Sequence, residues 1–158
     1  VDAYIPPAYI VNEQQKLDIY KRIAGVETPA ESEDMKEELL DRFGQVPVCV
    51  ENLLRIALIR VKAHSLYITE VKSRDEGKKR EGALKLQLRP DAFLRVENIP
   101  GLLRLYGSAL SFSAKGTPYF LLRYKKEELA EKDAQKLLER TEELLSDMEK
   151  LLKMEESV

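Results

Sequence analysis

Charged residues of both signs gather in the stretch EELLDRFGQVP, residues 37–47, and their spacing could do chemistry. Glu38 lies three residues before Asp41 and four before Arg42, so the three would share one face of a helix. Two carboxylates on such a face can form charge-assisted hydrogen bonds with arginines of another protein. The alternative is a solvated helix face that binds nothing. On an exposed helix, an ion pair of Glu38 with Arg42 contributes only about 0.2–0.5 kcal/mol. Charge alone therefore favours the solvated face.

A second charged group is the stretch RDEGKKREG, residues 74–82. Its basic side chains are candidates for contact with nucleic-acid phosphates, and the four candidates are Arg74, Lys78, Lys79 and Arg80. No aromatic residues interleave with them to stack on bases. The stretch also falls between two predicted strands, so the favoured interpretation is a solvated hairpin tip, with nucleic-acid contact as the alternative.

The sequence predicts no catalytic residue and no metal site. His64 is the only histidine and Cys49 the only cysteine, whereas a metal site needs several ligands. We expect His64 to lie at the surface near a helix end, and Cys49 to be a buried, unreactive thiol. The segment GKKREG lacks the glycine spacing of a P-loop, so we expect no nucleotide cofactor. A free-standing enzyme is the weakest interpretation.

The composition fits one domain in a reducing cytoplasm. The chain has 158 residues, of which 44% are hydrophobic and 34% charged, and its formal net charge is -2. Such a charge does not predict strong nonspecific binding to nucleic acid. No apolar run is long enough to cross a membrane, and no signal peptide is recognisable. Because the sequence begins with Val1 rather than Met, we expect a piece of a larger protein.

The elements that must position these residues are predicted from end signals and periodicity. Two prolines favour an extended segment over residues 1–11, which we expect to be a linker from a preceding region of the larger protein, and a single domain is predicted over 12–155. Asn12 and Ser32 are the expected N-caps of two helices, and Pro47 fits the first turn of a third. The predicted helices are 13–24, 33–43 and 48–63.

The second half of the chain changes to strand periodicity. Leucines alternate with polar residues at Leu84, Leu86 and Leu88, as in a strand with one buried face. Strands are predicted at 66–73, 83–89, 109–113 and 118–124, and the last two flank a hairpin turn. A short helix is predicted at 91–98 and a long amphipathic helix at about 127–153. The fold class is therefore α+β, with N-terminal helices, a small antiparallel sheet and a long C-terminal amphipathic helix.

Three blocks of the sequence occur in an order that resembles a known family. They are DAYIPPAYI at 2–10, QKLDIYKRIA at 15–24 and MKEELLDRFGQVPVCVENLLRIALIRVKA at 35–63. Together they resemble the C-terminal (TRCF) domain of bacterial transcription-repair coupling factors, the Mfd family. The resemblance is strong to about Leu66 and looser from there to the end.

This resemblance implies a regulatory role. Members of the family are ATP-dependent DNA translocases that displace stalled RNA polymerase from duplex DNA and recruit UvrA in nucleotide excision repair. ATP and magnesium belong to the motor domains of the parent protein, and none of their motifs is in this chain. By this resemblance, we expect the domain to pack on an N-terminal UvrB-like module of the same protein and to mask the UvrA-binding surface. The family's contact residues match Glu38, Asp41 and Arg42. An accessory DNA-binding domain that uses the basic loop 74–80 is the alternative.

Overall fold

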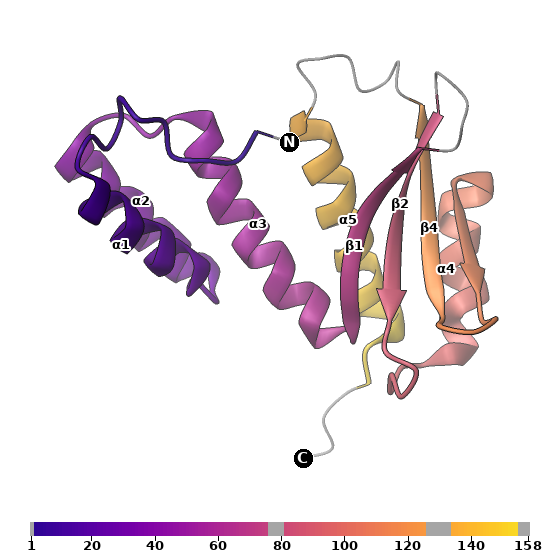
Figure 1. Cartoon of the computed structure of the whole chain (residues 1–158). Coiled ribbons are helices and arrows are strands. Elements are labelled where there is room, and N and C mark those ends of the chain that lie inside the picture. Colours follow the sequence, from indigo (N-terminus) through magenta and orange to yellow (C-terminus); the bar gives the residue numbers. More distant parts are fainter. Residues whose placement is uncertain (1, 76–80, 126–133, 155–158) are drawn as a thin grey trace. The chain divides into compact units, whose positions relative to one another are not determined.

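The computed structural model describes residues 2–75, 81–125 and 134–154. Contacts divide the chain into two compact units, Val1–Val61 and Lys62–Val158. Three N-terminal helices, a four-stranded antiparallel sheet and a C-terminal helix confirm the predicted α+β class (Figure 1). The predicted domain boundaries, 1–11 and 12–155, stay a prediction.

The first unit is built from α1 (Glu13–Ala24), α2 (Pro29–Phe43) and most of α3 (Val48–Ser65). Apolar side chains of all three helices form its core. The N-terminal segment, which we define as residues 2–11, adds Ile5 and Ile10 to that core, at 3% and 1% exposure. The buried members from the helices are Ile19, Ile23, Met35, Leu39, Val50, Leu54 and Ala57.

Helix α1 has the ends that the sequence predicts. The Asn12 side chain accepts a hydrogen bond from the Gln15 N–H at 3.0 Å, which satisfies one of the free donors of the first turn. At the other end, the Gly25 N–H donates to carbonyl oxygens of the last turn.

Helix α2 begins earlier than predicted. Thr28 is its N-cap and accepts a hydrogen bond from the Glu31 N–H at 3.1 Å, while Pro29 lies in the first turn. The predicted cap, Ser32, is a buried residue inside the helix. Proline suits the first turn because the N–H that it lacks would have no helical partner there. The predicted range 33–43 is therefore wrong at its start and right at its end.

The second unit contains a four-stranded sheet. Its strands are β1 (Ile68–Asp75), β2 (Glu81–Leu88), β3 (Leu110–Ser113) and β4 (Tyr119–Lys125). Their order across the sheet is β1-β2-β4-β3, and every neighbouring pair is antiparallel. The alternation predicted for Leu84, Leu86 and Leu88 is confirmed, since all three are buried.

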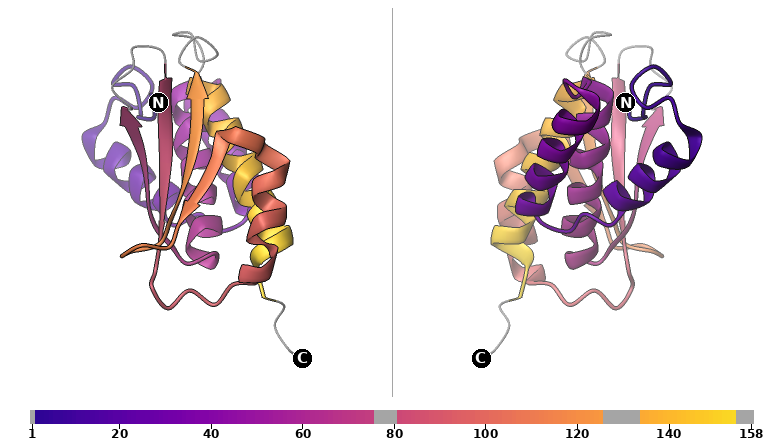
Figure 2. Two further views of the ribbon diagram at one scale, coloured as in Figure 1. Left: turned by 90° about the vertical axis from the view of Figure 1, so that its right-hand side faces the viewer. Right: turned by 90° about the vertical axis from the view of Figure 1, so that its left-hand side faces the viewer.

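Two helices complete the second unit. Helix α4 (Ile99–Tyr106) runs beside α5 (Ala134–Leu152) in both views of Figure 2. The Asn98 side chain, just before α4, donates a hydrogen bond to the Leu151 carbonyl at 2.7 Å. Leu144, Leu145, Met148 and Leu152 of α5 are fully buried. The long C-terminal helix is thus confirmed over 134–152, and the predicted residues 127–133 lie outside the described ones.

The helix predicted at 91–98 is wrong. Only Val96–Asn98 form a short 3-10 turn, η1, and the α-helix begins after it, with Pro100 in its first turn. Proline is compatible with this helix start, because the N–H that it lacks would have no helical partner in the first turn.

Candidate functional site

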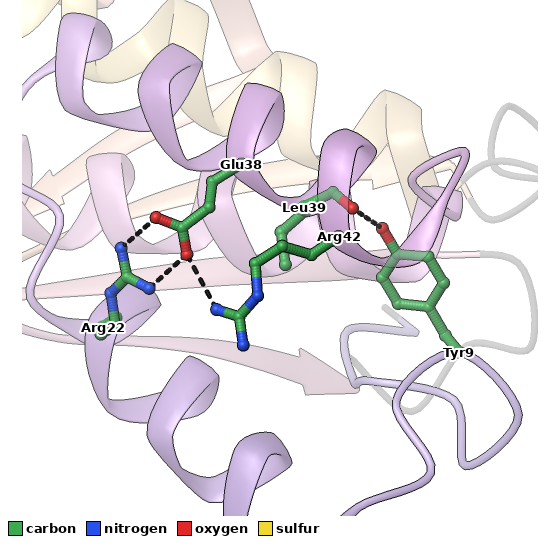
Figure 3. Close-up of polar contacts among 5 residues, drawn as sticks. All are labelled: Tyr9, Arg22, Glu38, Leu39 and Arg42. Atoms are coloured by element: carbon green, nitrogen blue, oxygen red, sulfur yellow. Dashed lines mark hydrogen bonds and ion pairs between the residues drawn. The ribbon is translucent and has the colours of Figure 1, made fainter.

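The candidate site is the C-terminal part of α2, where Glu38 lies between two arginines (Figure 3). Arg22, from the last turn of α1, donates from both terminal nitrogens to Glu38: Nη2 reaches Oε1 at 2.7 Å, and Nη1 bonds Oε2. Arg42, one turn further along α2, donates from Nη1 to the same Oε2 at 3.1 Å. A planar guanidinium and a planar carboxylate fit each other in such a two-pronged pair. The cluster therefore links α1 to the end of α2.

This arrangement keeps Glu38 ionised. The hydrogen bonds from Arg22, with a smaller contribution from Arg42, lower the pKa of the Glu38 carboxyl to about 2 against the opposing effect of burial. The same pairing raises the pKa of Arg22. Glu38 is not sealed from water, because 34% of its side chain is exposed. A carboxylate offers about four acceptor sites. Three donors use part of that capacity, so Oε1 can still accept a hydrogen bond.

Asp41 differs from Glu38. It lies on the exposed surface of α2, one turn from Glu38, and no described residue makes a hydrogen bond or ion pair with its carboxylate. Of the three side chains that the sequence singled out, Glu38 and Arg42 are joined to each other, and Asp41 stands beside them exposed to water. The sequence predicts that both carboxylates accept hydrogen bonds from arginines of a partner, but in the structure Glu38 already accepts them from Arg22 and Arg42, whereas Asp41 is exposed.

Two aromatic rings, those of Phe43 and Tyr9, pack at the end of α2 next to Arg42. The Arg42 guanidinium lies over the Phe43 ring, 4.9 Å from its centroid, which is a cation–π contact. Tyr9, from the N-terminal segment, packs its ring against Phe43 with centroids 5.8 Å apart. The Tyr9 hydroxyl lies 2.9 Å from the Gly44 carbonyl oxygen and 3.2 Å from that of Leu39, so its proton bridges these two acceptors.

Gly44 makes α2 end at this place. Its φ of 88° and ψ of -166° belong to a backbone region that essentially only glycine adopts. The Gly44 N–H donates to the Leu40 carbonyl at 3.1 Å and completes the last turn. Pro47 then starts α3, because the N–H groups of Val50 and Glu51 donate to its carbonyl oxygen.

The other predicted residues are not brought to this place. Lys78, Lys79 and Arg80 lie outside the described residues, and for Arg74 only the backbone, in β1, is described. The nucleic-acid contact therefore stays a prediction. His64 is exposed in the last turn of α3, as expected.

Cys49 is a free thiol that is half-buried rather than fully buried as predicted. Histidine, cysteine and acidic side chains form no group that could hold a metal among residues 2–75, 81–125 and 134–154. Within the same ranges, no helix is both long and apolar enough to span a membrane.

Arg22 and Tyr9 belong to the candidate site, but the sequence did not indicate either of them as a site residue. Arg22 is a basic residue in the last turn of α1, where it suits the helix dipole, so its position in the sequence does not indicate a partner on another helix. Tyr9 occurs in the stretch IPPAYI, which gives no sign that its hydroxyl reaches a residue 35 positions away.

Comparison with known proteins gives one consistent family. The TRCF domain family matches residues 1–97. The transcription-repair-coupling factor of Staphylococcus haemolyticus is 44% identical over 84 residues, which is 53% of this chain and 7% of that protein. The Haemophilus influenzae protein of the same name is 35% identical over 96 residues, 61% of this chain and 8% of that one. The matched part is thus a small fraction of these relatives.

A solved structure extends the likeness in fold to almost all of the chain. It is described as the C-terminal domain of transcription-repair coupling factor, and it superposes with a TM-score of 0.73. It covers 95% of this chain and 91% of its own, at 24% sequence identity. At that identity, the superposition supports the architecture of both units but not the role of any residue.

Proposed function

The chain belongs to the TRCF domain family, and on that basis we propose that it is a non-catalytic regulatory domain of a transcription-repair coupling factor. The parent protein would be an ATP-dependent DNA translocase that displaces stalled RNA polymerase and recruits UvrA. In the resting parent, this domain would pack on the N-terminal UvrB-like module and mask the surface that UvrA needs. The ATP site would lie in the motor and not in this chain.

The observation that carries the proposal is the unequal environment of the two carboxylates at the end of α2. Asp41 is exposed and no described residue pairs with it, so it can accept hydrogen bonds from an arginine on the module. Glu38 is fixed by Arg22 and Arg42, so it presents a rigid, partly exposed carboxylate next to Asp41. A fixed site loses less conformational freedom on binding than a mobile one.

A reversible mask also has to release. Polar contacts at the rim of an interface contribute specificity, association rate and salt sensitivity more than affinity. An interface held partly by such contacts can therefore be opened by a modest change in free energy elsewhere in the protein. The end of α2 fits this requirement, because the side chains that it exposes are largely charged.

The test is the affinity of this chain for the isolated UvrB-like module, measured by calorimetry at low and high salt. Asp41→Asn should weaken binding about tenfold, the loss expected for a charge-assisted hydrogen bond, and should reduce the salt dependence. Asp34→Asn is the matched control, because Asp34 is an exposed aspartate two turns earlier on the same helix. Circular dichroism checks that both variants fold.

The double change Glu38→Ala with Asp41→Ala should weaken binding more than Asp41→Asn does. In the intact parent, the same change should increase UvrA binding, because it loosens the mask. An affinity for the module that the double change leaves unaltered would remove the proposal. Equal effects of Asp41→Asn and Asp34→Asn would show that general negative charge, and not the end of α2, attracts the module.

A further inference from the structure

The N-terminal segment, residues 2–11, is attached to all three helices of the first unit. The Tyr4 N–H donates to the Cys49 carbonyl at 3.2 Å, which ties the segment to α3. The Ile5 N–H donates to the Tyr20 hydroxyl at 2.8 Å, which ties it to α1. Tyr9 supplies the attachment to α2. With Ile5 and Ile10 also buried, the segment has one defined position on the unit.

The attachment at Tyr9 falls on the proposed binding site. Its hydroxyl bridges the carbonyl oxygens of Leu39, inside the last turn of α2, and Gly44, just beyond that turn. Its ring supports Phe43. Figure 3 shows Tyr9 reaching the same end of the helix from which Arg42 extends towards Glu38.

From Tyr9, a continuous series of contacts leads into the charged cluster. Phe43 lies between the Tyr9 ring and the Arg42 guanidinium. Arg42 bonds Glu38, which in turn bonds Arg22. Each neighbour restricts the rotamers of the next. The position of the N-terminal segment therefore bears on the orientation of Arg42 and Glu38, although none of its residues touches either one directly in these contacts.

We infer that Tyr9 is a positioning residue through which the N-terminal segment controls the proposed partner-binding site. This inference rests on the function proposed above and adds its regulation. With the segment in place, Tyr9 holds the turn at Gly44 and the ring of Phe43, and the end of α2 is ordered for binding. When the segment is pulled away, both supports are lost.

Gly44 makes the end of α2 sensitive to the loss of Tyr9. Gly44 adopts a conformation that other residues avoid, and glycine itself is the residue with the most freedom to leave it. Without Tyr9, the turn after α2 is held by fewer contacts, and the last helical turn opens more often. A partner that binds only the ordered end then binds more weakly, in proportion to the fraction of molecules that are ordered. Tension on the segment would thus release the mask.

Two tyrosine variants of the full 158-residue chain test the inference. Tyr9→Phe removes the hydroxyl at α2 and keeps the ring against Phe43. Tyr20→Phe is the matched control, because it also removes a hydroxyl that bonds the segment, but at α1. The first measurement is hydrogen exchange at the Gly44 amide, which bonds the Leu40 carbonyl. The second is affinity for the isolated UvrB-like module.

We expect Tyr9→Phe to accelerate exchange at Gly44 about three- to tenfold and to weaken the module's binding by a similar factor, the net effect of one hydrogen bond. Tyr20→Phe should leave both values near wild type. Tyr9→Ala, which also removes the ring contact, should have a larger effect than Tyr9→Phe.

The exchange measurement needs no partner, so the two proposals fail separately. Wild-type exchange at Gly44 in Tyr9→Phe overturns the control by Tyr9, whatever the affinity. Equal acceleration in Tyr9→Phe and Tyr20→Phe also overturns it, because the effect would then be a general loosening of the unit. If the wild-type chain does not bind the module, the proposed function fails, and with it the regulatory role of Tyr9.

Discussion

Replacing Glu38 with glutamine keeps the size of the side chain and removes the charge that joins Arg22 to Arg42. Folding lowers the pKa of Glu38 from 4.5 to about 2. Taken in full, that change would correspond to about 3 kcal/mol, since one pKa unit equals about 1.4 kcal/mol. A third of the side chain is exposed and solvent screens the pair, so we expect Glu38→Gln to lose about 1 kcal/mol.

The pH dependence identifies this loss as electrostatic. Because folding lowers the pKa of Glu38, the unfolded chain binds more protons than the folded chain between about pH 4.5 and 2. The stabilisation from Glu38 is complete above that range and is lost as the pH falls through it. Wild type and Glu38→Gln should therefore differ at neutral pH and converge near pH 2. Urea denaturation followed by circular dichroism, repeated across this range, measures the difference.

Glu37→Gln is the control for a general effect of charge. Glu37 is the adjacent residue of α2, it is exposed, and no described residue pairs with its side chain. Its removal changes the net charge and the helix-dipole interaction by about the same amount. We expect it to be nearly neutral. The reasoning is refuted if both variants lose the same free energy, or if the loss in Glu38→Gln persists unchanged down to pH 2.

Three further changes test how the elements around the site are held. Thr28→Ala removes the cap of the Glu31 N–H and should destabilise the chain by about 1 kcal/mol in urea denaturation, whereas Thr28→Ser should restore it. Gly44→Ala should cost about 1–3 kcal/mol in the same assay, although its Cβ would touch nothing within 4 Å, because the backbone conformation disfavours alanine. Tyr106 of α4 donates to Asp147 of α5, and its pKa is raised by burial and by that carboxylate, so ultraviolet titration should show a step above the usual pH range of tyrosine. Tyr106→Phe should remove that late step and destabilise the chain by about 1 kcal/mol.

Local signals in the sequence were sufficient wherever one residue dictates one backbone feature. Asn12 is a helix cap because its side chain reaches the Gln15 N–H within one turn. The alternating leucines of β2 are buried because side-chain direction in a strand repeats every second residue. Such features depend on neighbours in the sequence, so they can be predicted without the tertiary structure.

The errors arose where two local signals competed. Thr28, Pro29 and Glu31 form a complete start signal for α2, but Ser32 follows at once and was preferred. The structure uses the earlier signal, and Ser32 is buried within the unit. Pro100 presents the same ambiguity, since proline both stops and starts helices.

The charged cluster was predictable only in part, for a physical reason. The pair of Glu38 with Arg42 follows from helical spacing alone. The pair of Glu38 with Arg22 joins two helices across 16 residues of sequence and depends on how these helices cross. Tyr9 reaches Gly44 only because the N-terminal segment packs on the core. No periodicity or cap residue encodes such contacts.

The geometry also limits how this site can be switched. The Glu38 carboxylate, with a pKa of about 2, and Arg22, whose pKa is raised by that carboxylate, keep their charges throughout the physiological pH range. The single histidine, His64, lies in the last turn of α3 and is not among the contacts of the cluster. A change of pH within this range therefore does not neutralise Glu38, and a change in geometry remains a means to alter the site. Tyr9 connects the end of α2 to a segment that leads away from it along the chain, so mechanical displacement of that segment is a route that fits a domain proposed to belong to a moving translocase.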